Sequence, residues 1–143
     1  MKILILHGPN LNLLGEREPD IYGTQTLGDI NAKLQELAHG LQIELRIIQS
    51  NHEGILVDSI QEHTKWADVL LINPGAFTHY SYALRDSIAA FAKPTVEVHL
   101  TDLNSREEFR KHSVLEGLSN VTRIMGKGAV GYYEALENLA SRK

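Results

Sequence analysis

Side chains suited to acid–base chemistry follow an apolar run near the N-terminus. Ile3–Leu6 reads as a buried strand, and the loop His7–Gly23 after it carries Asn10, Arg17 and Tyr22. Ligands of α/β proteins bind beyond the carboxyl ends of the strands. Loops longer than about 12 residues without structure of their own are usually functional or disordered. Because this loop has few disorder-promoting runs, we expect it to bind a ligand.

Tyr22 lies five residues after Arg17, so the two are candidates for a base and the charge that activates it. Free tyrosine has a pKa near ~10, and its use as a base at neutral pH requires about 4 kcal/mol of preferential stabilisation of the phenolate. A desolvated guanidinium group would supply this stabilisation. The alternative is structural: Tyr22 packs its ring over the sheet, and Arg17 is solvated.

Glu97 and His99 stand two residues apart in a predicted strand, Thr95–His99. Strand residues alternate in direction, so the two side chains share a face. A carboxylate that orients an imidazole or raises its basicity makes the histidine a suitable general acid. The alternative is an ion pair, buried or at the strand end, without a catalytic role.

A turn signal, Asn73–Ala76, follows another predicted strand. It either presents free N–H groups to oxygen atoms or an anion, or it only reverses the chain. His79 and Asp86 lie seven residues, or two turns, apart on the helix expected next, and so share a face. We expect His79 to donate to a ligand hydroxyl, and Asp86 to reach another subunit or a neighbouring helix.

Two arginines, Arg106 and Arg110, lie four residues apart on a short predicted helix and therefore on one side of it. Their position near the carboxyl end of the strand Thr95–His99 suits a clamp on a hydroxylated or carboxylated ligand. The alternative is a pair of solvated arginines on a helix that also carries Glu107 and Glu108.

Five β-rich runs, alternating with segments of helical spacing, must position these residues. The expected strands are Lys2–His7, Ile43–Gln49, Asp68–Ile72, Thr95–His99 and Val121–Met125. Helical segments are marked in turn by Ile30, Leu34, Leu37 and Leu41, by Ile55, Ile60 and Trp66, by Ala83, Leu84, Ile88 and Phe91, by Phe109, and by Tyr133, Leu136, Leu139 and Ala140. Nearly continuous apolar strands are typical of parallel sheets buried on both faces. The pattern predicts an α/β fold, a three-layer doubly wound sandwich with a five-stranded parallel sheet of flavodoxin-like order 2-1-3-4-5.

Two segments fit a capping box, in which a hydroxyl and a carboxylate satisfy N–H groups at the start of a helix. Ser105 with Glu108 fits the pattern at the short fourth helix, and Thr26 with Asp29 fits it at the first. Both therefore predict where a helix begins.

Composition favours one globular domain over residues 1–143. The chain is 43% hydrophobic and has a formal net charge of -4, which provides no basic field for nucleic acid or a membrane surface. It contains no cysteine, which excludes disulfides and thiolate chemistry and fits a reducing compartment. A signal-peptide pattern and apolar runs of ~18 residues are also missing. We therefore expect a cytoplasmic protein.

Two motif-like features carry little functional weight. Gly126–Gly131 matches the dinucleotide pattern G-x-G-x-x-G, but it follows the last strand, so close packing of a helix on the sheet explains it better. The seven histidines form no short metal-ligand pair, and His52 reads as the residue before a helix. No G-x-S-x-G nucleophile elbow occurs. We expect neither a metal nor a cofactor.

Taken together, these segments closely resemble the type II 3-dehydroquinate dehydratases, also called type II dehydroquinases. The matching segments, which run through nearly the whole chain in order, are Leu6–Arg17, Tyr22–Gly23, Gln49–Gly54, Asn73–His79, Ala83–Asp86, Glu97–Thr101 and Arg106–Arg110. The resemblance implies dehydration of 3-dehydroquinate to 3-dehydroshikimate through an enolate, without a metal or a Schiff base. The reaction would belong to the shikimate pathway of aromatic amino acid biosynthesis or to the quinate pathway.

The resemblance also implies a role for each catalytic residue. Tyr22, as tyrosinate, would remove the C2 proton with Arg17 stabilising its charge. Asn10 and the turn after Asn73 would hold a water against the enolate oxygen, as an oxyanion hole does. His99, oriented by Glu97, would protonate the departing C1 hydroxyl.

Substrate contacts follow from the same resemblance. The amides of Leu100 and Thr101 would bind the carboxylate, and Arg106 would close with a lid near residues 17–24. Asp86 would reach into a neighbouring subunit's site in a dodecamer built from trimers. Ring hydroxyls would contact three side chains: Asn73, His79 and Arg110.

The alternative function is a flavodoxin-like binding module for FMN or another phosphoryl ligand, which would use the same strand ends. Such a module needs a hydroxyl- and glycine-rich phosphate loop after the first strand. Gly8–Gly15 is poor in hydroxyls and is interrupted by Pro9, which favours the dehydratase.

Overall fold

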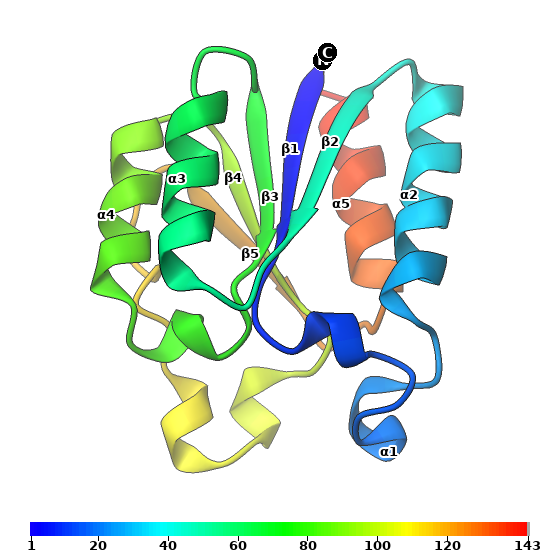
Figure 1. Cartoon of the computed structure of the whole chain (residues 1–143), viewed down its shortest axis with the longest axis vertical. Coiled ribbons are helices and arrows are strands. Elements are labelled where there is room, and N and C mark those ends of the chain that lie inside the picture. The colour runs from blue at the N-terminus through cyan, green and yellow to red at the C-terminus, as the bar shows by residue number, and fades with distance from the viewer. Residues whose placement is uncertain (143) are drawn as a thin grey trace.

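A parallel sheet forms the centre of the computed structural model, which describes residues 1–142. Its strand order is β2-β1-β3-β4-β5 (Figure 1), which confirms the predicted order. The strands are β1 (Lys2–His7), β2 (Glu44–Gln49), β3 (Val69–Asn73), β4 (Thr95–His99) and β5 (Val121–Met125). The second and third begin one residue later than predicted, and the third also ends one residue later.

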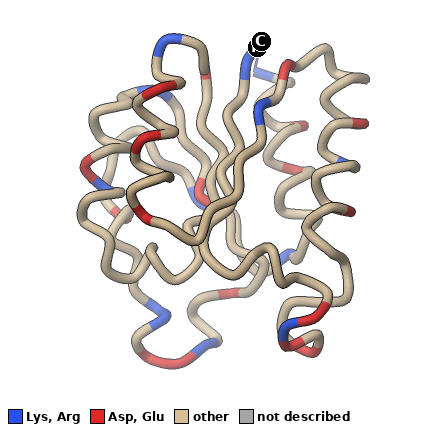
Figure 2. Tube along the Cα trace, viewed as in Figure 1, with Lys and Arg blue, Asp and Glu red and all other residues tan. Residues whose placement is uncertain are grey.

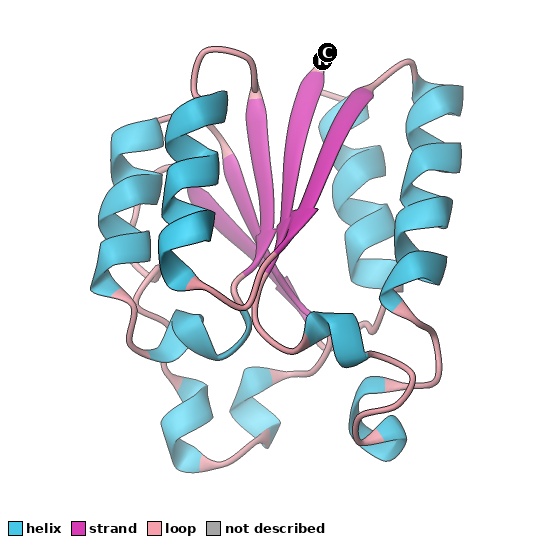
Figure 3. Cartoon of the chain, viewed as in Figure 1, coloured by secondary structure: helices cyan, strands magenta, loops and turns pink. Residues whose placement is uncertain are grey.

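Helices cover both faces of the sheet, as the predicted three-layer sandwich requires. Figures 1 and 3 show α2 (Leu27–Leu41) and α5 (Val130–Ala140) on one face, with α3 (Glu53–His63) and α4 (Tyr82–Phe91) on the other. Because strand residues alternate, β1 contributes to both apolar cores. Ile3 and Ile5 join the α2–α5 side, and Leu4 and Leu6 join the α3–α4 side. No helix within residues 1–142 has the length and apolar character needed to cross a membrane.

The strands differ in burial, which corrects the expectation that all five are covered on both faces. The inner strands β1, β3 and β4 are buried almost throughout, whereas β2 and β5 are only partly buried. β2 and β5 are the edge strands. Each has a neighbouring strand on one side only, so more of its surface is left open to solvent.

One of the two predicted capping boxes is confirmed. At the start of α2, Thr26 Oγ1 accepts from the Asp29 amide at 3.1 Å, and the Asp29 carboxylate accepts from the Thr26 amide at 3.0 Å. The box at Ser105 is wrong, because that residue ends one 3-10 helix, η3 (Leu103–Ser105), and its hydroxyl donates to the Asp102 carbonyl at 2.8 Å. The chain then starts a separate 3-10 helix, η4 (Glu108–Lys111).

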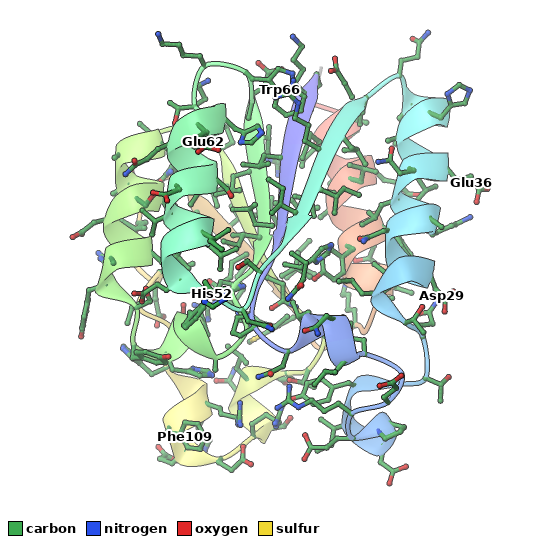
Figure 4. All side chains as sticks on the ribbon, viewed as in Figure 1. Asp29, Glu36, His52, Glu62, Trp66 and Phe109 are labelled. Atoms are coloured by element: carbon green, nitrogen blue, oxygen red, sulfur yellow. The ribbon has the colours of Figure 1, made fainter. Side chains whose placement is uncertain are left out.

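The second predicted helix is shorter than its apolar pattern indicated. α3 ends at His63, so Trp66 lies beyond it, and Ile55 is exposed rather than buried. Trp66 (Figure 4) packs instead against the guanidinium group of Arg46, 4.1 Å from its ring centroid. His52 is the residue that precedes α3, as predicted.

Connections at the carboxyl edge of the sheet contain short helices that the sequence did not predict. The loop after β1 includes η1 (Leu11–Leu13) and α1 (Pro19–Tyr22), and the loop after β3 includes η2 (Gly75–His79). These segments and the η3–η4 connection gather below the sheet in Figure 1. The residues with predicted chemistry therefore come from three strand ends that meet at one edge.

Candidate active site

A cavity of about 200 Å³ opens at the carboxyl ends of β1, β3 and β4. Apart from Glu97 and Asp86, every predicted site residue lines it: Asn10, Arg17, Tyr22, Asn73, His79, His99, Leu100, Thr101, Arg106 and Arg110. The carboxyl ends of parallel strands share one edge of a sheet, which explains how residues so distant in sequence converge.

Glu97 lies directly behind His99, with no exposed surface of its own. Its Oε1 is 2.7 Å from Nε2 of His99, so this ring nitrogen faces the carboxylate. The two side chains share a face of β4, as strand alternation predicts. The other ring nitrogen, Nδ1, is then the one available to a ligand, because His99 also lines the cavity.

The buried carboxylate of Glu97 has three further partners, none of which the sequence reasoning identified. Oε1 also accepts hydrogen bonds from the hydroxyl groups of Thr78 and Ser113, and Oε2 lies 3.1 Å from Nε of Arg123. Burial alone would raise the pKa of Glu97, but the contacts with His99, Thr78 and Arg123 outweigh it and lower the pKa to about 2. Glu97 is therefore an anion at neutral pH.

Tyr22 ends helix α1 close to two guanidinium groups. The central carbon of Arg17 lies 4.9 Å from the ring centroid, and that of Arg106 lies 5.4 Å from it. Nη2 of Arg106 also donates to the Tyr22 hydroxyl at 3.2 Å. The ring packs partly against the α2–α5 core, so the structural role considered for Tyr22 coexists with a position beside two cationic groups that also line the cavity.

Arg106 and Arg110 do not share a helix, contrary to the prediction. Arg106 follows η3, and Arg110 lies in η4, because the chain forms two short turns here rather than one helix. Both nevertheless line the cavity, and Glu107 holds them together: its Oε2 lies 3.6 Å from Nε of Arg106 and 2.8 Å from Nε of Arg110. Arg106 also donates to the Thr101 hydroxyl at 3.1 Å.

The loop after β1 is fastened to two neighbouring connections. Asn10 has a φ of 67°, a left-handed conformation that asparagine tolerates better than most residues. Its backbone N–H donates to Oδ1 of Asn51 at 2.9 Å. The backbone N–H of Gly8 donates to the backbone carbonyl oxygen of Asn73 at 2.8 Å. A Cβ at Gly8 would lie 2.5 Å from the Pro74 carbonyl oxygen, so this close approach requires glycine.

His79 lies at the end of η2, and its hydrogen bonding indicates its tautomer. Nδ1 is 2.7 Å from the His112 carbonyl oxygen and must therefore carry a hydrogen. Burial lowers the pKa of His79, so the ring is neutral at neutral pH and Nε2 is an acceptor. A ligand hydroxyl would then donate to His79, which corrects the expectation that His79 is the donor. The ring also packs edge-on against Phe109 (Figure 4), which projects from the η3–η4 connection.

Asp86 lies on α4, exposed and outside the cavity lining. The expectation that it shares a helix face with His79 is wrong, because His79 belongs to η2 and α4 begins only after Ser81. The Ser81 hydroxyl caps α4 by accepting from the Leu84 amide at 3.0 Å. The side chain of Asp86 therefore does not line the cavity of its own chain.

Comparison with known proteins relates nearly the whole chain to one family. A family model described as dehydroquinase class II matches residues 1–140. A curated relative from Pelotomaculum thermopropionicum, named 3-dehydroquinate dehydratase, is 55% identical over 99% of this chain and 97% of its own length. A Bacillus licheniformis relative of the same name is 52% identical over 94% of this chain and 92% of its own.

Solved structures show the same similarity in three dimensions. The type II dehydroquinase from Butyrivibrio crossotus matches with a TM-score of 0.93 and 45% identity over 97% of each chain. The type II dehydroquinase from Propionibacterium acnes matches with a TM-score of 0.92 and 38% identity, over 98% of this chain and 96% of that one. Both matches cover nearly the whole chain.

Proposed function

Because the chain belongs to the class II dehydroquinase family, we propose that it is a hydro-lyase that converts 3-dehydroquinate into 3-dehydroshikimate and water, in the shikimate or the quinate pathway. One observation supports this proposal most strongly. A phenol close to two guanidinium groups and an imidazole held by a buried carboxylate line the same cavity. The curated relatives do not favour the alternative function of FMN or phosphoryl-ligand binding.

The base in this proposal is Tyr22. The substrate's C2 proton is acidic because it lies next to the C3 carbonyl group, and a tyrosinate oxygen accepts it. Arg17 and Arg106, both close to the ring, stabilise the negative charge on that oxygen. The electron pair from the broken C–H bond moves into the carbonyl group and forms an enolate.

The enolate oxygen gains negative charge, and preorganised donors lower the energy of that state. Asn10 and the turn after Asn73 are placed at the cavity wall to hold a water against it. The hydrogen bonds from Asn10 to Asn51 and from Gly8 to Asn73 fix the loop after β1 relative to its neighbours. Little reorganisation is then needed when the charge develops.

The acid is His99. When the enolate collapses, the C1–C2 double bond forms, and the C1 hydroxyl leaves with a proton from Nδ1 of His99. The carboxylate of Glu97, 2.7 Å from Nε2, keeps the ring oriented with Nδ1 toward the substrate. An acid of this kind typically contributes about 10²–10⁴-fold to the rate.

The remaining polar groups of the cavity bind the substrate. The backbone amides of Leu100 and Thr101 take its carboxylate, and Arg106 closes over it with a lid near residues 17–24. The ring hydroxyls contact three side chains that line the cavity: Asn73, His79 and Arg110. Lid closure would exclude water where the tyrosinate acts.

The proposed chemistry requires neither a metal nor a Schiff base. In the described part of the chain, no lysine borders the cavity, so an amine able to form a covalent imine with the C3 carbonyl is not at hand. Among residues 1–142, no group of three or more histidine, aspartate or glutamate side chains is placed to hold a metal ion. Enolate stabilisation by neutral donors is sufficient.

The proposal includes a homo-oligomer, a dodecamer built from trimers, in the cytoplasm. Asp86 on α4 would complete a neighbouring subunit's site. Tyr80 and Tyr82, just before it, are 60% and 67% exposed, and such side chains suit contacts between copies. Static light scattering tests the assembly: we expect a multiple of the trimer mass, and a fully active monomer would contradict the role of Asp86.

The function is tested by a direct assay of the ultraviolet absorbance of the enone product. We expect the wild-type protein to turn over 3-dehydroquinate and Tyr22→Phe to lose nearly all turnover. Tyr133→Phe, which removes a hydroxyl outside the cavity that has no hydrogen-bond partner among the described residues, measures the general cost of such a substitution. Normal turnover by Tyr22→Phe would refute the base, and a lysine adduct trapped with borohydride would refute the route without a Schiff base.

A further inference from the structure

A buried chain of hydrogen bonds leads away from the cavity and has no part in the reaction steps above. His7 at the end of β1 and Tyr132 on α5 both have no exposed surface. Nδ1 of His7 lies 3.1 Å from the Tyr132 hydroxyl, and Nε2 lies 2.8 Å from Oδ1 of Asn31 on α2. Polar groups this deep in a core are costly unless every one is paired.

The direction of each hydrogen bond follows from Asn31, the acceptor at the end of the chain of hydrogen bonds away from the cavity. Oδ1 of Asn31 can only accept, so Nε2 of His7 carries a hydrogen. Burial lowers the pKa of His7 to about 4, so the ring is neutral and its other nitrogen is an acceptor. The Tyr132 hydroxyl must therefore donate to Nδ1 of His7, which leaves its oxygen to accept from another group.

That other group is Asn73 at the cavity wall. Asn73 is the register partner of His7 on the neighbouring strand β3, so the two side chains lie on the same face of the sheet, and the Asn73 side chain is a hydrogen-bond partner of Tyr132. Because the phenolic hydrogen already points to His7, the Asn73 amide nitrogen is the donor. Oδ1 of Asn73 accepts from the Gly75 amide at 3.0 Å. The amide is thus held at both its oxygen and its nitrogen, with one N–H remaining.

We propose that Tyr132 and His7 are positioning residues, which fix the side-chain amide of Asn73 so that its remaining N–H faces a hydroxyl group of the ligand. Without them the amide can turn over and present its oxygen instead. The proposal rests on the proposed function in one respect, namely that Asn73 binds a ring hydroxyl of the substrate. The substrate class contacted is a polyhydroxylated ring.

The test compares two adjacent tyrosines of α5. Tyr132→Phe removes the hydroxyl that holds Asn73, and Tyr133→Phe removes a buried hydroxyl that has no hydrogen-bond partner among the described residues. We expect Tyr132→Phe to raise KM about fivefold, the effect of one hydrogen bond, with kcat within about twofold of wild type. Tyr133→Phe should change neither constant. A wild-type KM in Tyr132→Phe, with only a lower melting temperature, would overturn the proposal.

A second pair of variants separates hydrogen bonding from packing. His7→Leu leaves the Tyr132 hydroxyl without an acceptor and should raise KM as Tyr132→Phe does. His7→Asn keeps an acceptor oxygen near the position of Nδ1 and should recover most of the wild-type KM. Equal KM values for the two His7 variants would contradict the proposed role.

The failure of this inference can be told apart from a failure of the proposed function. Absence of 3-dehydroquinate turnover in the wild-type protein would refute the function alone. NMR of the Asn73 side-chain amide then still reports on its positioning, because one of its two protons should exchange slowly in wild type and in Tyr133→Phe, and rapidly in Tyr132→Phe. Identical exchange in all three proteins would overturn the positioning role.

Discussion

His7 and His99 occupy equivalent places in the fold but have opposite surroundings. Each is the last residue of a buried strand at the same edge of the sheet, and each is almost completely buried. His99 lies against a carboxylate that is ionised at neutral pH. His7 lies between a tyrosine hydroxyl and an asparagine oxygen, both uncharged. We call these the Glu97 cluster (Glu97, His99, Thr78, Ser113, Arg123) and the His7 cluster (His7, Tyr132, Asn31).

The comparison shows how the groups next to a buried histidine decide what it can do. In the proposed mechanism the anion beside His99 orients the ring for proton transfer, whereas burial without a charged partner keeps His7 uncharged and restricts it to directing hydrogen bonds. Apart from Glu97, the charged residues lie on helices and loops, at the start of β1 or on the edge strands β2 and β5 (Figure 2), and among residues 1–142 Glu97 is the only buried Asp, Glu, Lys or Arg. The ionised Glu97 inside the sheet is therefore an exception that calls for a function.

Glu97→Leu should produce the largest effect and break the comparison at its charged side. It leaves His99, two hydroxyls and Arg123 without their acceptor, and loss of one partner of a buried ion pair costs about 3–5 kcal/mol in unfolding free energy. Turnover should fall with it. Denaturant unfolding and the enone assay measure both quantities.

The matched control is Glu134→Gln, which breaks an ion pair with Lys127 that lies partly in solvent. Exposed pairs contribute up to about 1 kcal/mol. A similar destabilisation in the two variants would mean that the Glu97 cluster has no special energetic role.

The two clusters should also lose unfolding free energy in different pH ranges, and the loss due to His7 is close in size to that expected for Glu97→Leu. The unfolded chain protonates His7 below pH 6.5, but the folded protein does so only near pH 4, so the unfolded state binds more protons between these values and stability falls as pH falls. The expected loss is about 3 kcal/mol. Glu97, with its pKa lowered from 4.5 to about 2, adds a second loss only below pH 4.5.

Unfolding free energies of wild type and His7→Asn, measured from pH 7 to about pH 2, test the window between pH 6.5 and pH 4. The variant should have a shallower slope in that window and an unchanged one below it. Parallel curves would show that His7 is not held neutral in the folded protein.

Gly8→Ala should have a smaller effect, because it disturbs the junction between the two clusters. Its Cβ would meet the Pro74 carbonyl oxygen at 2.5 Å, so the loop after β3 has to move and carry Asn73 with it. Overpacking of this kind costs about 1–3 kcal/mol. Gly40→Ala, where a Cβ meets nothing within 4 Å, should change stability by no more than about 1 kcal/mol. Equal melting temperatures and KM values for both variants would contradict this account.

The elements and most of the cavity lining could be predicted because they depend on local periodicity. Strand alternation places Glu97 and His99 on one face, and parallel strands bring Tyr22, Asn73 and His99 to one edge. Helix bounds were less predictable where two signals compete. At Ser105 the capping pattern is present, but the Asp102 side chain caps an earlier turn by accepting from the Asn104 amide at 2.9 Å.

The partners within each cluster could not be predicted, because they lie far apart in sequence and belong to common residue types. Arg123 on β5 and Ser113 in a loop carry no motif that links them to Glu97. Tyr132 follows a glycine-rich segment that suggested only close packing of a helix, and it forms the link from His7 to Asn73. Asp86 has its predicted role only in an assembly of several chains.

The most direct test of the difference between the clusters is the kcat of His99→Ala in the enone assay at neutral pH, with Tyr132→Phe measured beside it. The account predicts that His99→Ala lowers kcat by about 10²–10⁴-fold, as expected for loss of a general acid, while Tyr132→Phe changes chiefly KM. A His99→Ala variant that keeps a wild-type kcat would contradict the central claim that the Glu97 cluster delivers the proton.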